Sequence, residues 1–260
     1  EAPMEVQSHA HGTFCFPELN TQDIARDKRF YSELLGWSAF DVPSAAGGYS
    51  LMQLRGKDVA GVHLARNGPF GWLSYISVDS ADRTASLART LGAAVIADPF
   101  DVPGIGRMSM LQDPAGARFA LWQAAGHSGV RLADEPGAMY WNELFAHDVA
   151  AARTFYSGLF GWTTRETEVP SGPYTIFDAG ERSAAGMIQI QKDWGPVPPH
   201  WEVYFAVGDC DGAMRRAVEL GGTVLYGPLD VPKAGRLAGL QDLGRASFTV
   251  MQPAHAHEEA

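Results

Sequence analysis

The sequence has few of the residues that mark several common protein classes. Only two of its 260 residues are cysteines, Cys15 and Cys210, which is too few for a disulfide framework and favours a reducing, cytoplasmic compartment. Charged residues make up 19% of the chain, and the formal net charge is −10 without any run of lysine or arginine. Nucleic acids and anionic membrane surfaces are therefore not expected as partners.

Long apolar stretches are also lacking. No segment approaches the roughly 18–20 residues that a membrane helix needs, and the N-terminal EAPMEVQSHAHG has no apolar region typical of a signal peptide. The sequence contains no glycine-rich phosphate loop, nucleophile elbow, CxxC or HExxH. With 46% hydrophobic residues, the composition is that of a globular protein whose chemistry, if any, uses none of these motifs.

What the chain does have is an internal repeat. The segment FYSELLGW recurs 125 positions later as FYSGLFGW. Around it, residues 12–37 align without gaps to residues 137–162, and a second segment, residues 72–123, aligns to residues 201–252. The sequence therefore predicts two related halves, each of which contains two modules.

Each module is predicted to form one strand, one amphipathic helix and three further strands. In the first module, Asp23 has the position of an N-cap, and Gly36 has that of the glycine that ends a helix. The aromatic pair Phe30 and Tyr31 is expected to pack this helix on its own sheet, and Trp37 to begin the next strand. The repeated segment is thus interpreted as architectural rather than chemical.

Four βαβββ modules with the motifs FY…LGW and GR…DPAG…F resemble the vicinal oxygen chelate superfamily, which includes glyoxalase I, fosfomycin and bleomycin resistance proteins and extradiol dioxygenases. The run at Pro199–Phe205 is similar to a two-domain, glyoxalase-like actinobacterial subgroup, whose members include proteins described as hydroxylases and proteins of antibiotic gene clusters. The resemblance implies an α+β fold in which four βαβββ modules pair into two glyoxalase-like half-barrel domains. These are expected at residues 12–123 and 137–252, joined by a linker at residues 124–136.

The resemblance also implies a divalent metal inside a half-barrel, held by His and Glu side chains. Of the matching positions in this chain, only Glu202 carries such a residue. The others are Phe16, Leu73, Ala120, Trp141 and Thr249. A single Glu does not make a transition-metal site, so we expect no metal cofactor.

Several histidines could still contribute to a non-standard metal site. His63 lies in the last strand of the first module, where a lone His more commonly makes a structural hydrogen bond. The pairs His9–His11 and His255–His257 alternate along extended segments and could chelate a metal. Both pairs lie near the ends of the chain, where ordering the backbone costs entropy.

Strand alternation predicts which side chains share the pocket face of each half. In the second half they are Trp141, Glu143, His200, Glu202, Tyr204, Thr249 and Met251. In the first half they are Phe16, Glu18, Leu73, Tyr75, Arg118 and Ala120. The second half thus combines an aromatic wall with titratable groups that could supply an acid and a base. As a structural alternative, Glu18 and Glu143 could form buried pairs with Arg107 and Arg236, which also recur.

We interpret the chain as a protein that binds and transforms a small hydrophobic or aromatic molecule in a barrel cavity by metal-independent acid–base chemistry. The predicted catalytic residues are Glu202, His200 and Glu143. The predicted substrate-binding residues are Trp141, Tyr204, Thr249, Tyr75, Phe16, Glu18 and His63. Two alternatives remain open: a non-catalytic protein that sequesters a drug or metabolite, and a metal-dependent oxygenase or glyoxalase with displaced ligands. The chain is expected to act as a monomer or homodimer.

Overall fold

The computed structural model describes residues 5–43 and 48–254. The first half contains β1 (Phe14–Thr21), α1 (Ile24–Leu35), β2 (Ser38–Asp41), β3 (Tyr49–Leu54), β4 (Lys57–Leu64), β5 (Gly71–Ser77), α2 (Ala81–Thr90), β6 (Ala94–Val102), β7 (Gly106–Gln112) and β8 (Arg118–Ala124). The second half contains β9 (Met139–Ala146), α3 (Val149–Phe160), β10 (Thr163–Val169), β11 (Gly172–Ala179), β12 (Arg182–Gln189), the 3-10 helix η1 (Lys192–Trp194), β13 (His200–Ala206), α4 (Cys210–Glu219), β14 (Thr223–Val231), β15 (Gly235–Gln241) and β16 (Ser247–Pro253).

Each half builds one eight-stranded sheet from two modules. The strand orders are β2-β3-β4-β1-β5-β8-β7-β6 and β10-β11-β12-β9-β13-β16-β15-β14, so the two sheets have the same topology. In both, the first strands of the two modules pair antiparallel at the centre, β1 with β5 and β9 with β13. The predicted α+β fold of four βαβββ modules in two half-barrels is therefore confirmed.

The local signals of the sequence act as expected. The Asp23 side chain accepts a hydrogen bond from the backbone N–H of Arg26 and caps α1, and Gly36 ends this helix at a φ of 75°. In the DPAG turn, the Asp113 carboxylate accepts hydrogen bonds from three consecutive backbone N–H groups, those of residues 115–117. No helix in the described ranges is long and apolar enough to cross a membrane.

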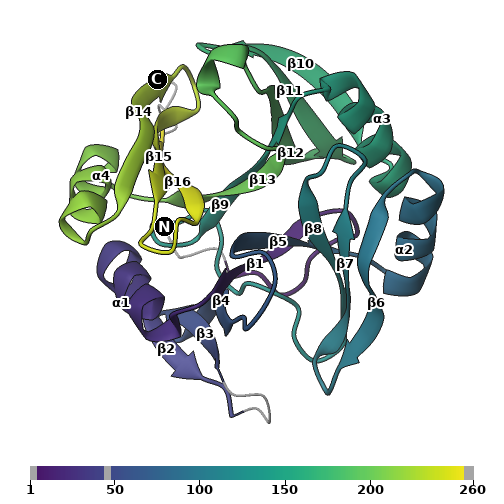
Figure 1. The fold of residues 1–260 in the computed structure, drawn as a ribbon, viewed down its shortest axis with the longest axis horizontal. Coiled ribbons are helices and arrows are strands. Elements are labelled where there is room, and N and C mark those ends of the chain that lie inside the picture. Colours follow the sequence, from purple (N-terminus) through teal and green to yellow (C-terminus); the bar gives the residue numbers. More distant parts are fainter. Residues whose placement is uncertain (1–4, 44–47, 255–260) are drawn as a thin grey trace.

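The halves meet through their helices as well as their central strands. Helix α1 lies beside α4, and α2 lies beside α3, so each module of one half touches a module of the other (Figure 1). At the centre, β5 contacts β13, and the Ser74 hydroxyl donates to the Asn142 side chain at 2.7 Å. Buried apolar residues from both halves form one continuous core.

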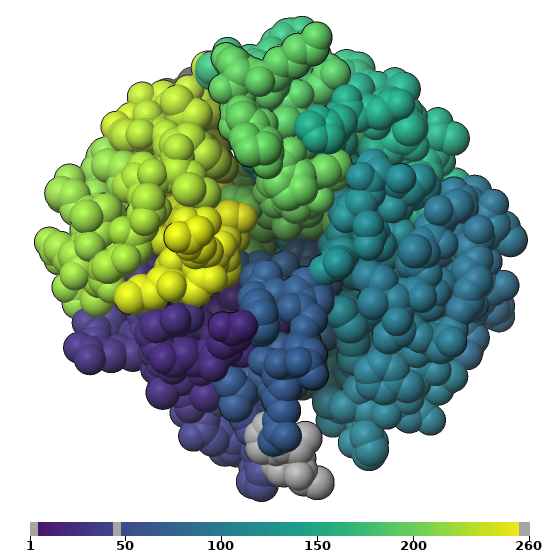
Figure 2. Space-filling view, viewed as in Figure 1, coloured from purple at the N-terminus to yellow at the C-terminus, as the bar shows by residue number. Residues whose placement is uncertain are grey.

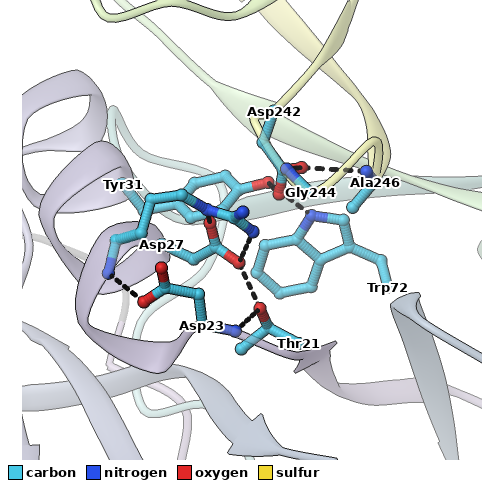
Figure 3. A network of polar contacts seen from close by, with 9 residues as sticks. Thr21, Asp23, Asp27, Tyr31, Trp72, Asp242, Gly244 and Ala246 are labelled. Carbon is cyan, nitrogen blue, oxygen red and sulfur yellow. Dashed lines mark hydrogen bonds and ion pairs between the residues drawn. The ribbon is translucent and has the colours of Figure 1, made fainter.

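The repeated FY…LGW segment lies at this junction. The Tyr31 hydroxyl donates to the buried Asp242 carboxylate of the other half at 2.9 Å and accepts from the Trp72 indole N–H at 2.9 Å (Figure 3). Asp242 also accepts from the backbone N–H groups of Gly244 and Ala246, which close the hairpin before β16. Tyr31 therefore connects its helix to the opposite half.

The second half makes the equivalent contacts to the first half. The Tyr156 hydroxyl donates to Asp113 at 2.9 Å and accepts from Trp201 at 2.8 Å. The indoles of the repeated GW pairs also cross over: Trp37 donates to the Gly137 carbonyl at 2.6 Å, and Trp162 to the Gly12 carbonyl at 2.8 Å. The aromatic pair does pack its helix on its own sheet, as expected, but the segment also binds the other half. It recurs because each half uses it to hold the other.

The segment between β8 and β9 packs on the first half. The Val130 N–H donates to the Cys15 carbonyl at 2.8 Å, and the Trp122 indole donates to the His127 carbonyl at 2.8 Å. The His127 ring stands edge-on to Phe16, with ring centres 5.4 Å apart. The predicted linker is thus an ordered cover over the strands of the first half-barrel.

Candidate functional site

The second half-barrel opens into a cavity of about 1880 Å³. Strands β9 to β14 of the second half all contribute to its lining, and the cavity extends to the N-terminal segment around His9. Figure 2 shows this face hollowed between the C-terminal strands (yellow) and the segment before β13 (green). Aromatic side chains contribute much of the wall, namely Trp141, Phe145, Tyr174, Trp194, Tyr204 and Tyr226.

Glu143 lies on this wall between two tyrosines. Tyr174 donates to its Oε2 at 2.6 Å and Tyr204 to its Oε1 at 2.8 Å. Gly186 makes the first contact possible, because a Cβ at that position would lie 1.7 Å from the Tyr174 hydroxyl. The suggested Glu143–Arg236 pair is wrong, since Arg236 binds Asp211 and Asp230.

The Glu18–Arg107 pair is wrong as well. Arg107 binds Asp82 and Asp101 on the outside of the first half. The repeated Arg residues therefore hold their helices and hairpins together, and the repeated Glu residues bond to tyrosines instead.

Glu202 is buried beside Glu143 and is held by hydroxyls. Ser247 donates to its Oε2 at 2.7 Å, and Thr249 donates to its Oε1 at 3.1 Å. Because the single Thr249 proton points to Glu202, the Tyr226 hydroxyl, 2.7 Å from the Thr249 oxygen, must be the donor of their bond. Thr249 is fully buried behind Glu202 and is not part of the cavity wall.

His200 completes this group of polar residues. Its Nε2 lies 3.4 Å from Glu202 Oε2, and its Nδ1 lies 2.8 Å from the Pro198 carbonyl. The ring stacks on Phe145 with centres 4.8 Å apart and planes 12° apart. Burial lowers the pKa of His200, but Glu202, the Pro198 carbonyl and the charge of Glu143 together raise it by more, so the net shift is upward.

The two carboxylates lie directly opposite each other on paired strands, with Glu202 of β13 facing Glu143 of β9. Burial raises the pKa of Glu143 to about 7 and the negative charge of Glu202 adds to the shift, against the opposing effect of the two tyrosine hydrogen bonds. The structure thus brings together Glu143, His200, Glu202, Trp141 and Tyr204, as predicted for one pocket face, and holds a protonatable carboxyl there near neutral pH.

The first half repeats only part of this arrangement. Glu18 accepts from Tyr49 at 2.9 Å and from Tyr75 at 3.0 Å. His63 lies 3.0 Å from the Asn20 side chain, the structural hydrogen bond that a lone His was expected to make. The predicted residues Phe16, Glu18, His63 and Tyr75 do not line the cavity of the second half.

Sequence reasoning missed Tyr174, Tyr226 and Ser247. Tyr174 could have been found, because Tyr49 precedes it by the same 125 positions that separate Glu18 from Glu143. Tyr226 was harder to place, because two register shifts in the β14–β15 pairing flank it and interrupt strand alternation.

The side chains at the family's metal positions do not fit a divalent metal. Phe16, Leu73, Ala120 and Trp141 offer no ligand atom, and the Thr249 hydroxyl is already bonded to Glu202 and Tyr226. Across residues 5–43 and 48–254, no three His, Cys, Asp or Glu residues cluster as a metal site would require. Of the two alternating His pairs, His9 contacts the Val130 carbonyl and His11 contacts Asp79, while His255–His257 lies outside the described residues.

A family model described as a glyoxalase-like domain matches residues 17–122 and again residues 142–243. The chain belongs to this glyoxalase-like family. Among relatives, the protein named "Putative glyoxylase CFP32" of Mycobacterium tuberculosis (strain CDC 1551 / Oshkosh) is 37% identical over 95% of this chain and 97% of its own length. Anthracycline biosynthesis protein DnrV of Streptomyces peucetius is 36% identical over 94% of both chains.

Solved structures of other proteins share this fold. The Mn(II)-bound glyoxalase from Novosphingobium aromaticivorans superposes with a TM-score of 0.65 at 13% identity, covering 93% of this chain and 82% of that one. The 2,3-dioxygenase LapB from Pseudomonas sp. KL28 gives a TM-score of 0.64 at 12% identity, covering 97% and 96%. At such identities the likeness concerns the fold alone.

Proposed function

We propose that this glyoxalase-like protein binds a small hydrophobic or aromatic molecule in the cavity of its second half and exchanges a proton with it through Glu143. The observation that carries the proposal is the pair of opposed, buried carboxylates on the wall of a large aromatic cavity. A carboxyl with a pKa of about 7 can act as an acid or as a base at neutral pH.

The remaining polar residues take supporting roles. Glu202 is held in place by Ser247 and Thr249, and its Coulombic effect raises the pKa of Glu143 and so favours the protonated form of Glu143. His200 lies at the cavity wall and pairs with Glu202, which makes it the second group able to carry a proton to or from the ligand. No step in this scheme uses a metal, because the residues at the metal positions do not fit one.

The curated relatives support an aromatic ligand. Two proteins of about one-third identity, DnrV and DauV, are named for anthracycline biosynthesis. A role for this chain in making or modifying an aromatic natural product agrees with the lining of Trp141, Tyr204 and Tyr226.

One observation favours sequestration without turnover as the second candidate. Both Glu143 oxygens already accept a tyrosine hydroxyl. A carboxylate held in this way can serve as a fixed recognition group whose hydrogen bonds need not change during binding.

Calorimetric titration with an anthracycline aglycone tests the proposal. We expect saturable binding at one site, weakened at least about tenfold by Trp141→Ala and unchanged by Leu73→Ala in the first half. Chromatography of the bound ligand then separates the two candidates. A converted ligand, with a rate that Glu143→Gln reduces about 10²-fold, supports proton-transfer catalysis. An unchanged ligand supports sequestration. Binding that resists Trp141→Ala and is abolished by Tyr75→Phe would move the site to the first half.

A further inference from the structure

Almost all hydrogen-bond donors of the site already donate to acceptors of the protein itself. Tyr174 and Tyr204 donate to Glu143, Ser247 and Thr249 donate to Glu202, and Tyr226 donates to Thr249. The Trp141 indole N–H donates to the Tyr174 oxygen at 3.0 Å. Both ring nitrogens of His200 face oxygens, those of Pro198 and Glu202.

The side chains around Glu143 can therefore accept further hydrogen bonds but have few free donors. Each carboxylate oxygen has two lone pairs, and only one on each Glu143 oxygen is used by a tyrosine. A ligand that brings only acceptors, such as a carboxylate or phosphate, would find only the O–H of a protonated Glu143 there and would lie against two buried acids. A ligand with a hydrogen-bond donor can donate to the unused lone pairs of the Glu143 oxygens.

We infer that the ligand is an organic ammonium, with a hydrophobic or aromatic body in the cavity and a protonated amine against Glu143. This inference rests on the proposed function and adds the chemical class of the ligand. A cation is favoured over a neutral donor because Glu143 and Glu202 face each other and, among the described residues, the only basic side chain paired with either is His200, which pairs with Glu202. Aromatic side chains beside the carboxylates add cation–π attraction.

The charges at the cavity mouth do not oppose this assignment. The lining residues Arg182, Lys233 and Arg245 are exposed, where water and salt screen them. The lining also contains His9 and His11 and the acidic Asp134 and Glu168. Glu143 and Glu202 are 7% and 2% exposed, so their interaction with a ligand is screened far less. A bound cation also favours the ionised form of Glu143, so binding near pH 7 should release a proton from it.

Three naphthalene probes of matched shape test the inference: 2-naphthylmethylamine, 2-naphthylmethanol and 2-naphthoate. We expect calorimetry at pH 7 to show the amine binding at least about tenfold more tightly than the alcohol, and the carboxylate most weakly. Titration of the amine in two buffers of different ionisation enthalpy should show proton release. Glu143→Gln should remove both the preference for the amine and the proton release, and it should leave binding of the alcohol within about threefold.

Glu18→Gln is the matched control, because Glu18 has the same two tyrosine donors but lies in the first half. It should leave the preference for the amine unchanged. Equal binding of amine and alcohol would overturn the ammonium assignment and leave the proposed aromatic cavity intact. If neither these probes nor the aglycone bind, the proposed function fails together with the inference.

Discussion

The two halves share a Tyr–Glu–Tyr arrangement and differ in what surrounds it. The shared positions are Glu18 and Glu143, Tyr49 and Tyr174, Tyr75 and Tyr204, and Gly61 and Gly186. Since the first half keeps this arrangement without facing the large cavity, a Glu held by two tyrosines belongs to the fold. It becomes a candidate site only where other polar groups join it.

Those other groups occur together in the second half. Where the first half has Leu73, Ala97, Met110, Arg118 and Ala120, the second has Glu202, Tyr226, Gly239, Ser247 and Thr249. Gly239 leaves the space that the Tyr226 ring occupies, because a Cβ there would lie 2.1 Å from a ring carbon. The five differences thus form one connected chain of contacts rather than scattered substitutions.

The largest effect is expected from the acids that join the halves. Asp242→Ala leaves the buried Tyr31 hydroxyl, the buried Ala246 N–H and the partly exposed Gly244 N–H without their acceptor, which should cost roughly 3–5 kcal/mol of unfolding free energy. Asp113→Ala should cost about the same, because it removes the acceptor of the Tyr156 hydroxyl and of three backbone N–H groups. Denaturant unfolding measures both.

Asp242→Asn and Asp113→Asn serve as controls, since the amide oxygen keeps an acceptor and should limit the loss to under about 2 kcal/mol. Strong destabilisation by only one of the two alanine variants would show that the halves are not held together symmetrically.

The next effect is pH-dependent and concerns Glu143. Its pKa rises from 4.5 to about 7 on folding, so the folded protein binds this proton more tightly than the unfolded chain. The stabilisation from this proton is complete below pH 4.5 and is lost as pH rises to about 7, a total of about 3 kcal/mol. The stability of Glu143→Gln relative to the unsubstituted protein should therefore increase over this window.

Glu18→Gln should show a change of the same sign, because burial also raises the pKa of Glu18, with Tyr49, His63 and Tyr75 opposing the shift. Measuring unfolding free energies between pH 4 and pH 8 on both variants compares the halves directly. If the unfolding free energy of Glu143→Gln relative to that of the unsubstituted protein falls with rising pH, the raised pKa of Glu143 is contradicted.

The comparison of halves also explains what the sequence could predict. Repetition of whole segments was enough to place the modules, and alternation along β9 and β13 put Trp141, Glu143, His200, Glu202 and Tyr204 on one face. Both inferences use patterns that can be read along the chain, namely the repetition of segments and the alternation of side chains within a strand.

The contacts that the sequence did not predict join segments far apart in the chain. Tyr31 reaches Asp242 across 211 positions, and Trp162 reaches Gly12 across 150. No periodicity within one module reports on such a contact. The same holds for Tyr226, whose strand carries bulges that no local pattern locates.

Gly239→Met copies the first half's residue into the second and should have an intermediate effect. The new side chain collides with the Tyr226 ring, so we expect a loss of about 1–3 kcal/mol and at least tenfold weaker ligand binding in calorimetry. Adding Tyr226→Ala, which copies Ala97, should restore most of the stability but not the binding. If the single variant is as stable as the unsubstituted protein, the two positions are not coupled.

The smallest effect is expected for Tyr226→Phe. This change removes the hydroxyl that donates to Thr249 but keeps the ring, and Glu202 retains its bonds from Ser247 and Thr249. The lost hydrogen bond should cost about 0.5–1.5 kcal/mol. Tyr174→Phe is the sharper comparison, because it removes a direct donor to Glu143 and should raise the pKa of that carboxyl further. The pH dependence of unfolding should therefore shift to higher pH in Tyr174→Phe and stay in place in Tyr226→Phe. A loss in Tyr226→Phe as large as that in Asp242→Ala would mean that this tyrosine holds the second half together rather than tuning its site.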